Sequence, residues 1–164
     1  MKINITGGIG EGKTTLSAFD NALLQAGVHN YNLITLSSII PTGATIVVRK
    51  PTVLPEEYGY RLYVVRADQR SRESGKWIGA ALGWYQLSNG AGMFVEHETI
   101  EDTESAVIDG LNLKVKQSLS DLCQNRKIAF SSKNMRIKIS HTQVKQLAAC
   151  VLVLAVFQSE PWQE

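Results

Sequence analysis

The sequence predicts an α+β fold, a four-layer αββα sandwich of mainly antiparallel sheets, built as a single domain over residues 1–164. Most of the chain consists of short runs of β type separated by turn residues, and only two segments have helical periodicity. A length of 164 residues with 44% hydrophobic side chains is enough for one core. Because the turns are too short for crossover helices, consecutive strands are expected to pair antiparallel, with the helices on the outer faces.

The chain starts with a predicted strand and a predicted helix on either side of a glycine-rich segment. Polar and apolar residues alternate from Lys2 to Thr6, which is typical of a strand. From Leu16 to Ala26 apolar residues recur at helical spacing, and Gly27 follows as a stop signal. This second segment is therefore expected to form the first helix.

Further strands are predicted in the middle of the chain. Each run has strand character and is bounded by turn formers such as Gly, Pro, Asn and Ser. The predicted strands are Tyr31 to Leu36, Ala44 to Arg49, Tyr60 to Arg66, Trp77 to Tyr85 and Gly92 to His97.

After Thr99 the spacing of apolar residues changes from that of a strand to that of a helix. An apolar stripe at helical spacing there predicts the second helix. Thr99 and Asp102 have the spacing of a cap near its start. Two strands, about Met135 to Ser140 and Ala149 to Phe157, complete the predicted sheets. The stripe consists of Val107, Ile108, Leu111, Val115, Leu119 and Leu122.

Composition and charge exclude several classes of protein. A net charge of +2 without a basic run predicts no nucleic-acid partner. Two cysteines, Cys123 and Cys150, lack the spacing of a zinc site and are expected to be buried thiols. The start of the chain lacks a signal-peptide pattern, and the apolar stretch Leu147 to Phe157 is too short to span a bilayer. We therefore expect a cytoplasmic protein without a membrane role.

The segment Gly7 to Thr14 matches the phosphate-binding pattern G-x-x-x-x-G-K-[ST]. In a nucleotide-binding enzyme its backbone would cradle phosphates, Lys13 would reach the β- and γ-phosphates, and Thr14 would hold magnesium. That fold needs a parallel sheet with crossover helices, which the strand–turn pattern does not predict. A P-loop phosphotransferase therefore stays the less favoured alternative. The other interpretation is a glycine-rich turn in which backbones approach closely.

The pair Ser37-Ser38 follows an apolar run and precedes Ile39, Ile40 and Pro41. Two small hydroxyl residues on a tight bend place a nucleophile beside its own scissile carbonyl. That arrangement suits self-cleavage of the backbone, which would leave a small chain, 1–37, and a large chain, 38–164.

Around this pair the sequence resembles the pyruvoyl-dependent arginine decarboxylases. The resemblance implies that Ser38 becomes a covalently bound pyruvoyl group, so that neither pyridoxal phosphate nor a metal is needed. It also implies that the glycine-rich segment does not bind nucleotide. The matching segments are Gly10 to Gly12, Leu16 to Leu24, Gly27, Asn30, Asn32 to Pro41, Tyr58 to Tyr60, Phe94 to Glu98 and the final Ala- and Val-rich strand.

The resemblance implies self-processing as the first step. Ser38 Oγ attacks the Ser37 carbonyl, the resulting ester eliminates to dehydroalanine, and tautomerisation and hydrolysis give the pyruvoyl group and ammonia. Asn32 corresponds to the residue that assists cleavage, and a side-chain amide suits stabilisation of the oxyanion. Without the resemblance, Asn32 would be interpreted as a turn residue.

The resemblance implies decarboxylation of L-arginine to agmatine and CO2 as the second step. The pyruvoyl ketone forms a Schiff base with the substrate amine and acts as an electron sink. Glu96 protonates the α-carbon, and partial burial is expected to raise its pKa. Asp20 matches the carboxylate that binds the guanidinium. The alternatives are a solvated strand Glu and a solvated helix Asp. Strand alternation places His97 on the face opposite Glu96, without an assigned role.

The resemblance also implies a homotrimer, or a dimer of trimers, with active sites between neighbouring subunits. Decarboxylation of another amino acid on the same scaffold remains an alternative, because the segments Pro51 to Glu57 and Asn112 to Lys133 match the family poorly. Trp77, Trp84 and Trp162 are expected in core or interface packing.

Overall fold

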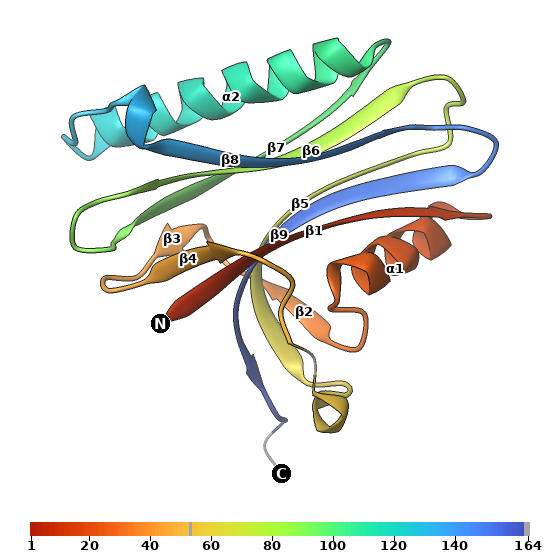
Figure 1. The fold of residues 1–164 in the computed structure, drawn as a ribbon, viewed down its shortest axis with the longest axis horizontal. Helices are drawn as coiled ribbons and strands as arrows, with labels where there is room; N and C mark the ends of the chain where they lie inside the picture. The colour runs from red at the N-terminus through yellow and green to blue at the C-terminus, as the bar shows by residue number, and fades with distance from the viewer. Residues whose placement is uncertain (53, 163–164) are drawn as a thin grey trace.

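A computed structural model describes residues 1–52 and 54–162; residue 53, within the poorly matching segment Pro51 to Glu57, and residues 163–164 lie outside the described part. The structure confirms the predicted sandwich: two stacked sheets carry α1 on one outer face and α2 on the other (Figure 1). Among the described residues, no helix is both long and apolar enough to cross a membrane.

The first sheet has the strand order β2-β5-β9-β1-β4 and the second has the order β3-β7-β6-β8. The second sheet is antiparallel throughout, and the first is antiparallel except for β1 with β4 and β2 with β5, which pair parallel. The helices are α1 (Thr15–Ala26) and α2 (Glu104–Asn125), with short 3-10 turns at Pro55–Glu57 and Ser132–Asn134. The strands are β1 (Lys2–Gly12), β2 (Asn32–Thr35), β3 (Ile39–Ile40), β4 (Thr45–Val48), β5 (Arg61–Ser71), β6 (Trp77–Gln86), β7 (Gly92–Glu101), β8 (Met135–Gln143) and β9 (Ala148–Glu160).

Apolar side chains fill all three spaces between the four layers. Leu23, Leu152 and Leu154 lie in the cluster between α1 and the first sheet. Ile3, Ile5 and Phe94 lie between the two sheets. The predicted stripe of α2 packs on the second sheet, with Val107, Leu111, Val115 and Leu119 fully buried.

Each helix is capped at its N-terminus by a threonine. Thr14 and Ser17 form a capping box at α1, and Gly27 ends that helix with φ of 80°. The cap of α2 is Thr103, whose hydroxyl accepts the Ala106 N–H at 3.2 Å. The prediction of Thr99 as the cap is wrong, because Thr99 belongs to β7, whose pairing with β6 continues to Glu101.

The glycine-rich segment Gly7 to Gly12 is part of strand β1, so its interpretation as a turn is wrong, while the close approach of backbones expected there is confirmed. It pairs residue by residue with β9, while α1 lies directly against it. A Cβ on Gly8 would lie 2.0 Å from the Ala22 carbonyl oxygen, and one on Gly10 would lie 2.2 Å from the Ala18 carbonyl oxygen. The glycines are therefore required because the helix backbone touches the strand backbone.

We expect Gly10→Ala to lower the free energy of unfolding by about 3 kcal/mol, because its new methyl group must push α1 away from β1. The matched control is Gly110→Ala in α2, where a Cβ meets nothing within 4 Å. That variant should be neutral or stabilised by up to about 1 kcal/mol. Urea unfolding measures both, and equal stability of Gly10→Ala and the original chain would contradict the role given to Gly10.

Candidate active site

The bend Ser37-Ser38 is the point at which the chain crosses from one sheet to the other. Strand β2 lies in the first sheet, and β3 begins one residue after Ser38 in the second. Ser38 has φ of 68°, a left-handed conformation that costs a non-glycine residue about 1–2 kcal/mol. The Ser38 carbonyl accepts the Phe94 N–H at 2.8 Å, and Ile39 pairs with Met93. Pairing with β7 therefore holds the strained bend in place.

Glu96 lies on β7 and meets the bend directly. The Ser38 hydroxyl donates a hydrogen bond to Glu96 Oε1, which joins residues 58 positions apart. Glu96 is half-buried, and it lies two residues after Phe94 on the same face of the strand. The structure thus brings together the two residues that the sequence predicted as nucleophile and acid.

A cavity of about 410 Å³ opens beside Ser38 and Glu96. This volume suits a small ligand such as an amino acid. The bend contributes one side, β7 the floor, and the C-terminal half of α2 the other side. The lining residues are Ser37, Ser38, Ile39, Met93, Phe94, Val95, Glu96, His97, Ser118, Asp121, Leu122 and Arg126.

His97 faces α2, as strand alternation predicted, and its Nε2 lies 2.8 Å from Ser118 Oγ. Burial, and then the positive charge of Lys114, lower the pKa of His97 below its usual value. The ring is therefore biased toward the neutral form. His97 also lines the cavity, because β3 pairs with β7 only at Gly92 and Met93 and leaves the later part of that edge open.

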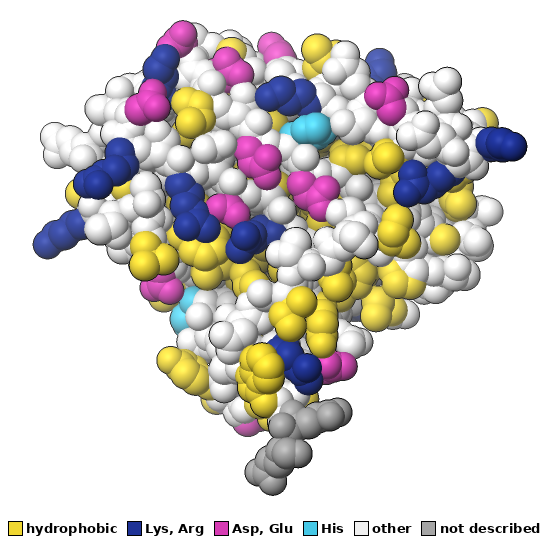
Figure 2. Space-filling view, turned by 180° about the vertical axis from the view of Figure 1, so that it is seen from behind, with side chains coloured by type: hydrophobic (Ala, Val, Ile, Leu, Met, Phe, Trp, Pro, Cys, Tyr) yellow, Lys and Arg dark blue, Asp and Glu magenta, His cyan; other side chains and the backbone are white. Residues whose placement is uncertain are grey.

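Further charged groups lie beside Glu96 along the edges of β7 and β5. Burial, and then the charges of Asp68 and Glu96, raise the pKa of Glu98. Asp68 is paired with two arginines, at 3.0 Å to Arg66 Nε and 2.9 Å to Arg70 Nε. Figure 2 views the molecule from the side of these edges and shows acidic and basic side chains intermixed at the centre of that face. Within the described residues, no cluster of three or more His, Cys, Asp or Glu side chains is arranged to hold a metal ion.

Asp20 and Asn32, the other two predicted site residues, do not line this cavity in the part of the chain that the structure describes. Asp20 is exposed on α1, one turn from Leu16 and one turn from Leu24, whose exposed fractions are 69% and 56%. Asn32 begins β2, and its Nδ2 donates to the Gly59 carbonyl oxygen at 2.6 Å. The extended chain puts its backbone about 13 Å from Leu36, so its amide cannot reach the Ser37 carbonyl of the same subunit.

The wall contributed by α2 was missed by the sequence analysis. Ser118, Asp121, Leu122 and Arg126 line the cavity, yet only Leu122 carried a signal, as part of the apolar stripe. The other three are polar residues at the margin of that stripe, where sequence alone cannot separate a cavity wall from a solvated face. Only the packing of α2 on β7 makes them part of the site.

Comparisons with known proteins point to one family. A family model described as pyruvoyl-dependent arginine decarboxylase (PvlArgDC) matches residues 2–161. A protein of that name from Methanothermobacter thermautotrophicus is 42% identical over 113 residues, which cover 66% of this chain and 71% of the relative. The corresponding Halobacterium salinarum protein is 36% identical over 115 residues, covering 67% of this chain and 70% of the relative. The Picrophilus torridus protein is 34% identical over 106 residues, covering 63% of this chain but only 58% of the relative.

Proposed function

This chain belongs to the pyruvoyl-dependent arginine decarboxylase family, a family of carboxy-lyases, and we propose that it cleaves itself between Ser37 and Ser38 and then decarboxylates L-arginine to agmatine and CO2. The observation that carries the proposal is the contact between Ser38 and Glu96: a strained residue with a hydroxyl group donates to a carboxyl oxygen, and both residues line an open cavity.

The proposed cleavage starts at Ser38 Oγ. Its attack on the Ser37 carbonyl carbon forms a C–O bond and breaks the C–N bond, and the hydroxyl proton is transferred to the departing nitrogen, which becomes a free amine. Loss of the Ser38 α-proton then expels the Ser37 carboxylate and leaves a C=C bond, and water converts the resulting enamine to a ketone and ammonia. Breaking this peptide bond also releases the left-handed strain at Ser38.

Ser38 fits the group that the family name implies, because its side chain lines the cavity and points to Glu96. A pyruvoyl group supplies an electron sink for loss of CO2. Glu96 then supplies a proton to the substrate carbon that has lost its carboxylate. The carboxyl group is suited to this role because it already contacts the side chain at position 38.

Recognition of the guanidinium is proposed to come from Asp20 of a neighbouring subunit. A planar guanidinium pairs best with a carboxylate that offers two oxygens. Asp20 lies between the exposed residues Leu16 and Leu24 on the outer side of α1. A contact between subunits that buries these two leucines would also place the Asp20 carboxylate against the neighbouring subunit. Asn32 is likewise too far from its own bend. Both positions support a homotrimer, or a dimer of trimers, in which each site is completed by its neighbour.

Ser38→Ala should leave the chain uncleaved and inactive, because it removes the attacking hydroxyl. Denaturing mass spectrometry should show fragments 1–37 and 38–164 for the original chain and one full-length mass for the variant. Ser37→Ala is the matched control and should still be cleaved, since the attack uses only the carbonyl of residue 37. Cleavage of Ser38→Ala at the same bond would rule out the proposed chemistry. Product analysis with arginine and other amino acids identifies the substrate.

Glu96→Gln should still be cleaved, because the amide oxygen can accept the Ser38 hydroxyl, but kcat should fall by about a hundredfold or more with the loss of the acid. The measurement is agmatine formation per cleaved chain. Glu73→Gln, in the exposed turn before β6, is the control and should keep full activity. Normal turnover by Glu96→Gln would remove Glu96 from the mechanism.

Asn32→Ala expressed alone should remain uncleaved, but it should regain cleavage when co-expressed with Ser38→Ala. In mixed trimers the second chain offers Asn32 to the intact Ser38 of the first. The readout is the mass of fragment 1–37 with alanine at position 32. Co-expression with the double variant Asn32→Ala/Ser38→Ala is the control and should give no rescue. Absence of rescue in both mixtures would mean that Asn32 does not act across subunits.

A further inference from the structure

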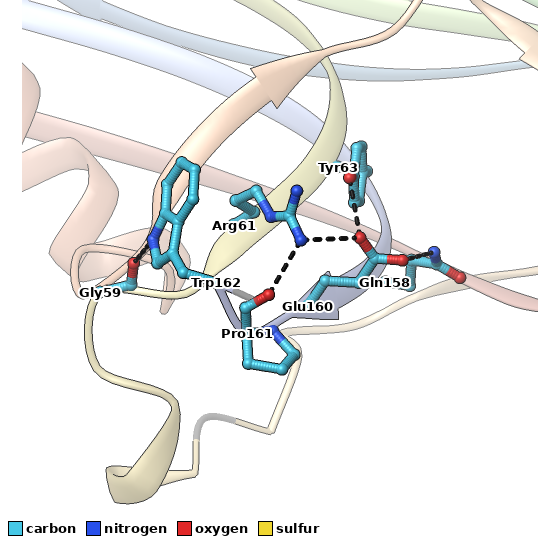
Figure 3. Close-up of polar contacts among 7 residues, drawn as sticks. All are labelled: Gly59, Arg61, Tyr63, Gln158, Glu160, Pro161 and Trp162. Carbon is cyan, nitrogen blue, oxygen red and sulfur yellow. Dashed lines mark hydrogen bonds and ion pairs between the residues drawn. The ribbon is translucent and has the colours of Figure 1, made fainter. Parts of the chain in front are cut away.

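Residues Glu160 to Trp162 lie at the end of strand β9, which is two strands from Asn32 in the first sheet. In adjacent strands Asn32 of β2 is in register with Arg61 of β5, and Arg61 is in register with Glu160 of β9. The chain continues from Glu160 through Pro161 to Trp162 across the turn that precedes β5 (Figure 3). We call these three residues, Glu160 to Trp162, the C-terminal clamp.

One carbonyl oxygen connects the C-terminal clamp to Asn32. The Gly59 oxygen accepts the Asn32 Nδ2 hydrogen bond at 2.6 Å and the Trp162 Nε1 hydrogen bond at 3.0 Å (Figure 3 draws the second). Gly59 has φ of 83°, a conformation that glycine adopts without strain. The direction of this carbonyl is therefore set by two donors from different parts of the chain.

Polar contacts hold the indole of Trp162 in place, although Trp162 is 61% exposed. The Arg61 guanidinium lies 5.0 Å from the ring centroid and donates to the Pro161 oxygen at 2.9 Å. Glu160 Oε2 lies 3.4 Å from the same guanidinium nitrogen and accepts the Tyr63 hydroxyl at 2.9 Å. Of the two predicted settings for Trp162, core or interface packing, the core is wrong, because its ring lies on the surface; interface packing stays a prediction.

We propose that Trp162 is a positioning residue for self-cleavage, acting through Gly59 on the amide of Asn32. This inference rests on the proposed role of Asn32. A side-chain amide stabilises an oxyanion only if its NH2 group, not its oxygen, faces the carbonyl under attack. The hydrogen bond from Asn32 Nδ2 to the Gly59 carbonyl fixes the orientation of the side-chain amide. The second N–H of the same NH2 group is then left to donate to the oxyanion. By holding the Gly59 carbonyl, Trp162 holds that orientation.

The test is Trp162→Phe, which keeps an aromatic ring over Arg61 but removes the N–H donor. Trp77→Phe is the matched control, since Trp77 lies on β6 in the other sheet. Freshly synthesised chains are followed by denaturing mass spectrometry to obtain the rate of cleavage. The melting temperature and the kcat per cleaved chain are measured on the same variants.

Cleavage of Trp162→Phe should be slower by about fivefold, the effect of one neutral hydrogen bond, with unchanged melting temperature and unchanged kcat per cleaved chain. Trp77→Phe should cleave at the original rate. A merely structural role would instead lower the melting temperature together with the cleavage rate. Cleavage of Trp162→Phe at the original rate overturns the inference but leaves the proposed function intact. Failure of the original chain to cleave would overturn the proposed function itself.

Discussion

The structure depends on the way in which one short crossing is held between the two sheets. The chain leaves the first sheet after β2 and enters the second at β3, and only Leu36, Ser37 and Ser38 lie between them. So short a connection forces a sharp change of direction, which Ser38 absorbs with its left-handed backbone. Backbone pairing fixes both ends, through Leu36 with β5 and Ser38 with β7. The same constraint places the Ser38 side chain against Glu96. The residue that turns the chain between the two sheets is therefore also the proposed nucleophile.

Local patterns were sufficient for the parts of this fold that depend on neighbours in sequence. The apolar stripe of α2 follows from burial on one face, the middle strands are bounded by turn formers, and both helices lie where predicted. The predicted strand Lys2 to Thr6 covers only the first part of β1. Its glycine-rich second part was interpreted as a turn, because the contact of its glycines with α1 leaves no periodic pattern. Thr99 was mistaken for a helix cap because strand β7 continues beyond its apolar residues. Pairing with β6 keeps the chain extended as far as Glu101.

The candidate site was predictable to the extent that it follows from a motif at fixed positions. Ser38 and Glu96 were identified from sequence, and the structure brings them together. The contributions of α2 and of the C-terminal clamp were not identified, because each depends on a contact between distant segments. Lys13 and Thr14 illustrate the reverse error: they complete a phosphate-binding pattern, yet Lys13 is an exposed residue after a strand and Thr14 is a helix cap. A short motif has chemical meaning only in the backbone geometry that it requires.

The position of the proposed cleavage explains how the fold would tolerate a broken chain. Residues 1–37 contribute β1, which lies between β9 and β4, together with α1 and β2. Buried residues such as Ile3, Ile5 and Ala22 anchor this part in two apolar clusters. Cutting one peptide bond removes none of these contacts and none of the strand pairs. It removes only the short connection that strains Ser38, so the small chain stays in place while position 38 gains freedom next to Glu96. A break within β1 or β2 would instead interrupt a strand, whereas the crossing is a place where the backbone is strained and no strand is cut.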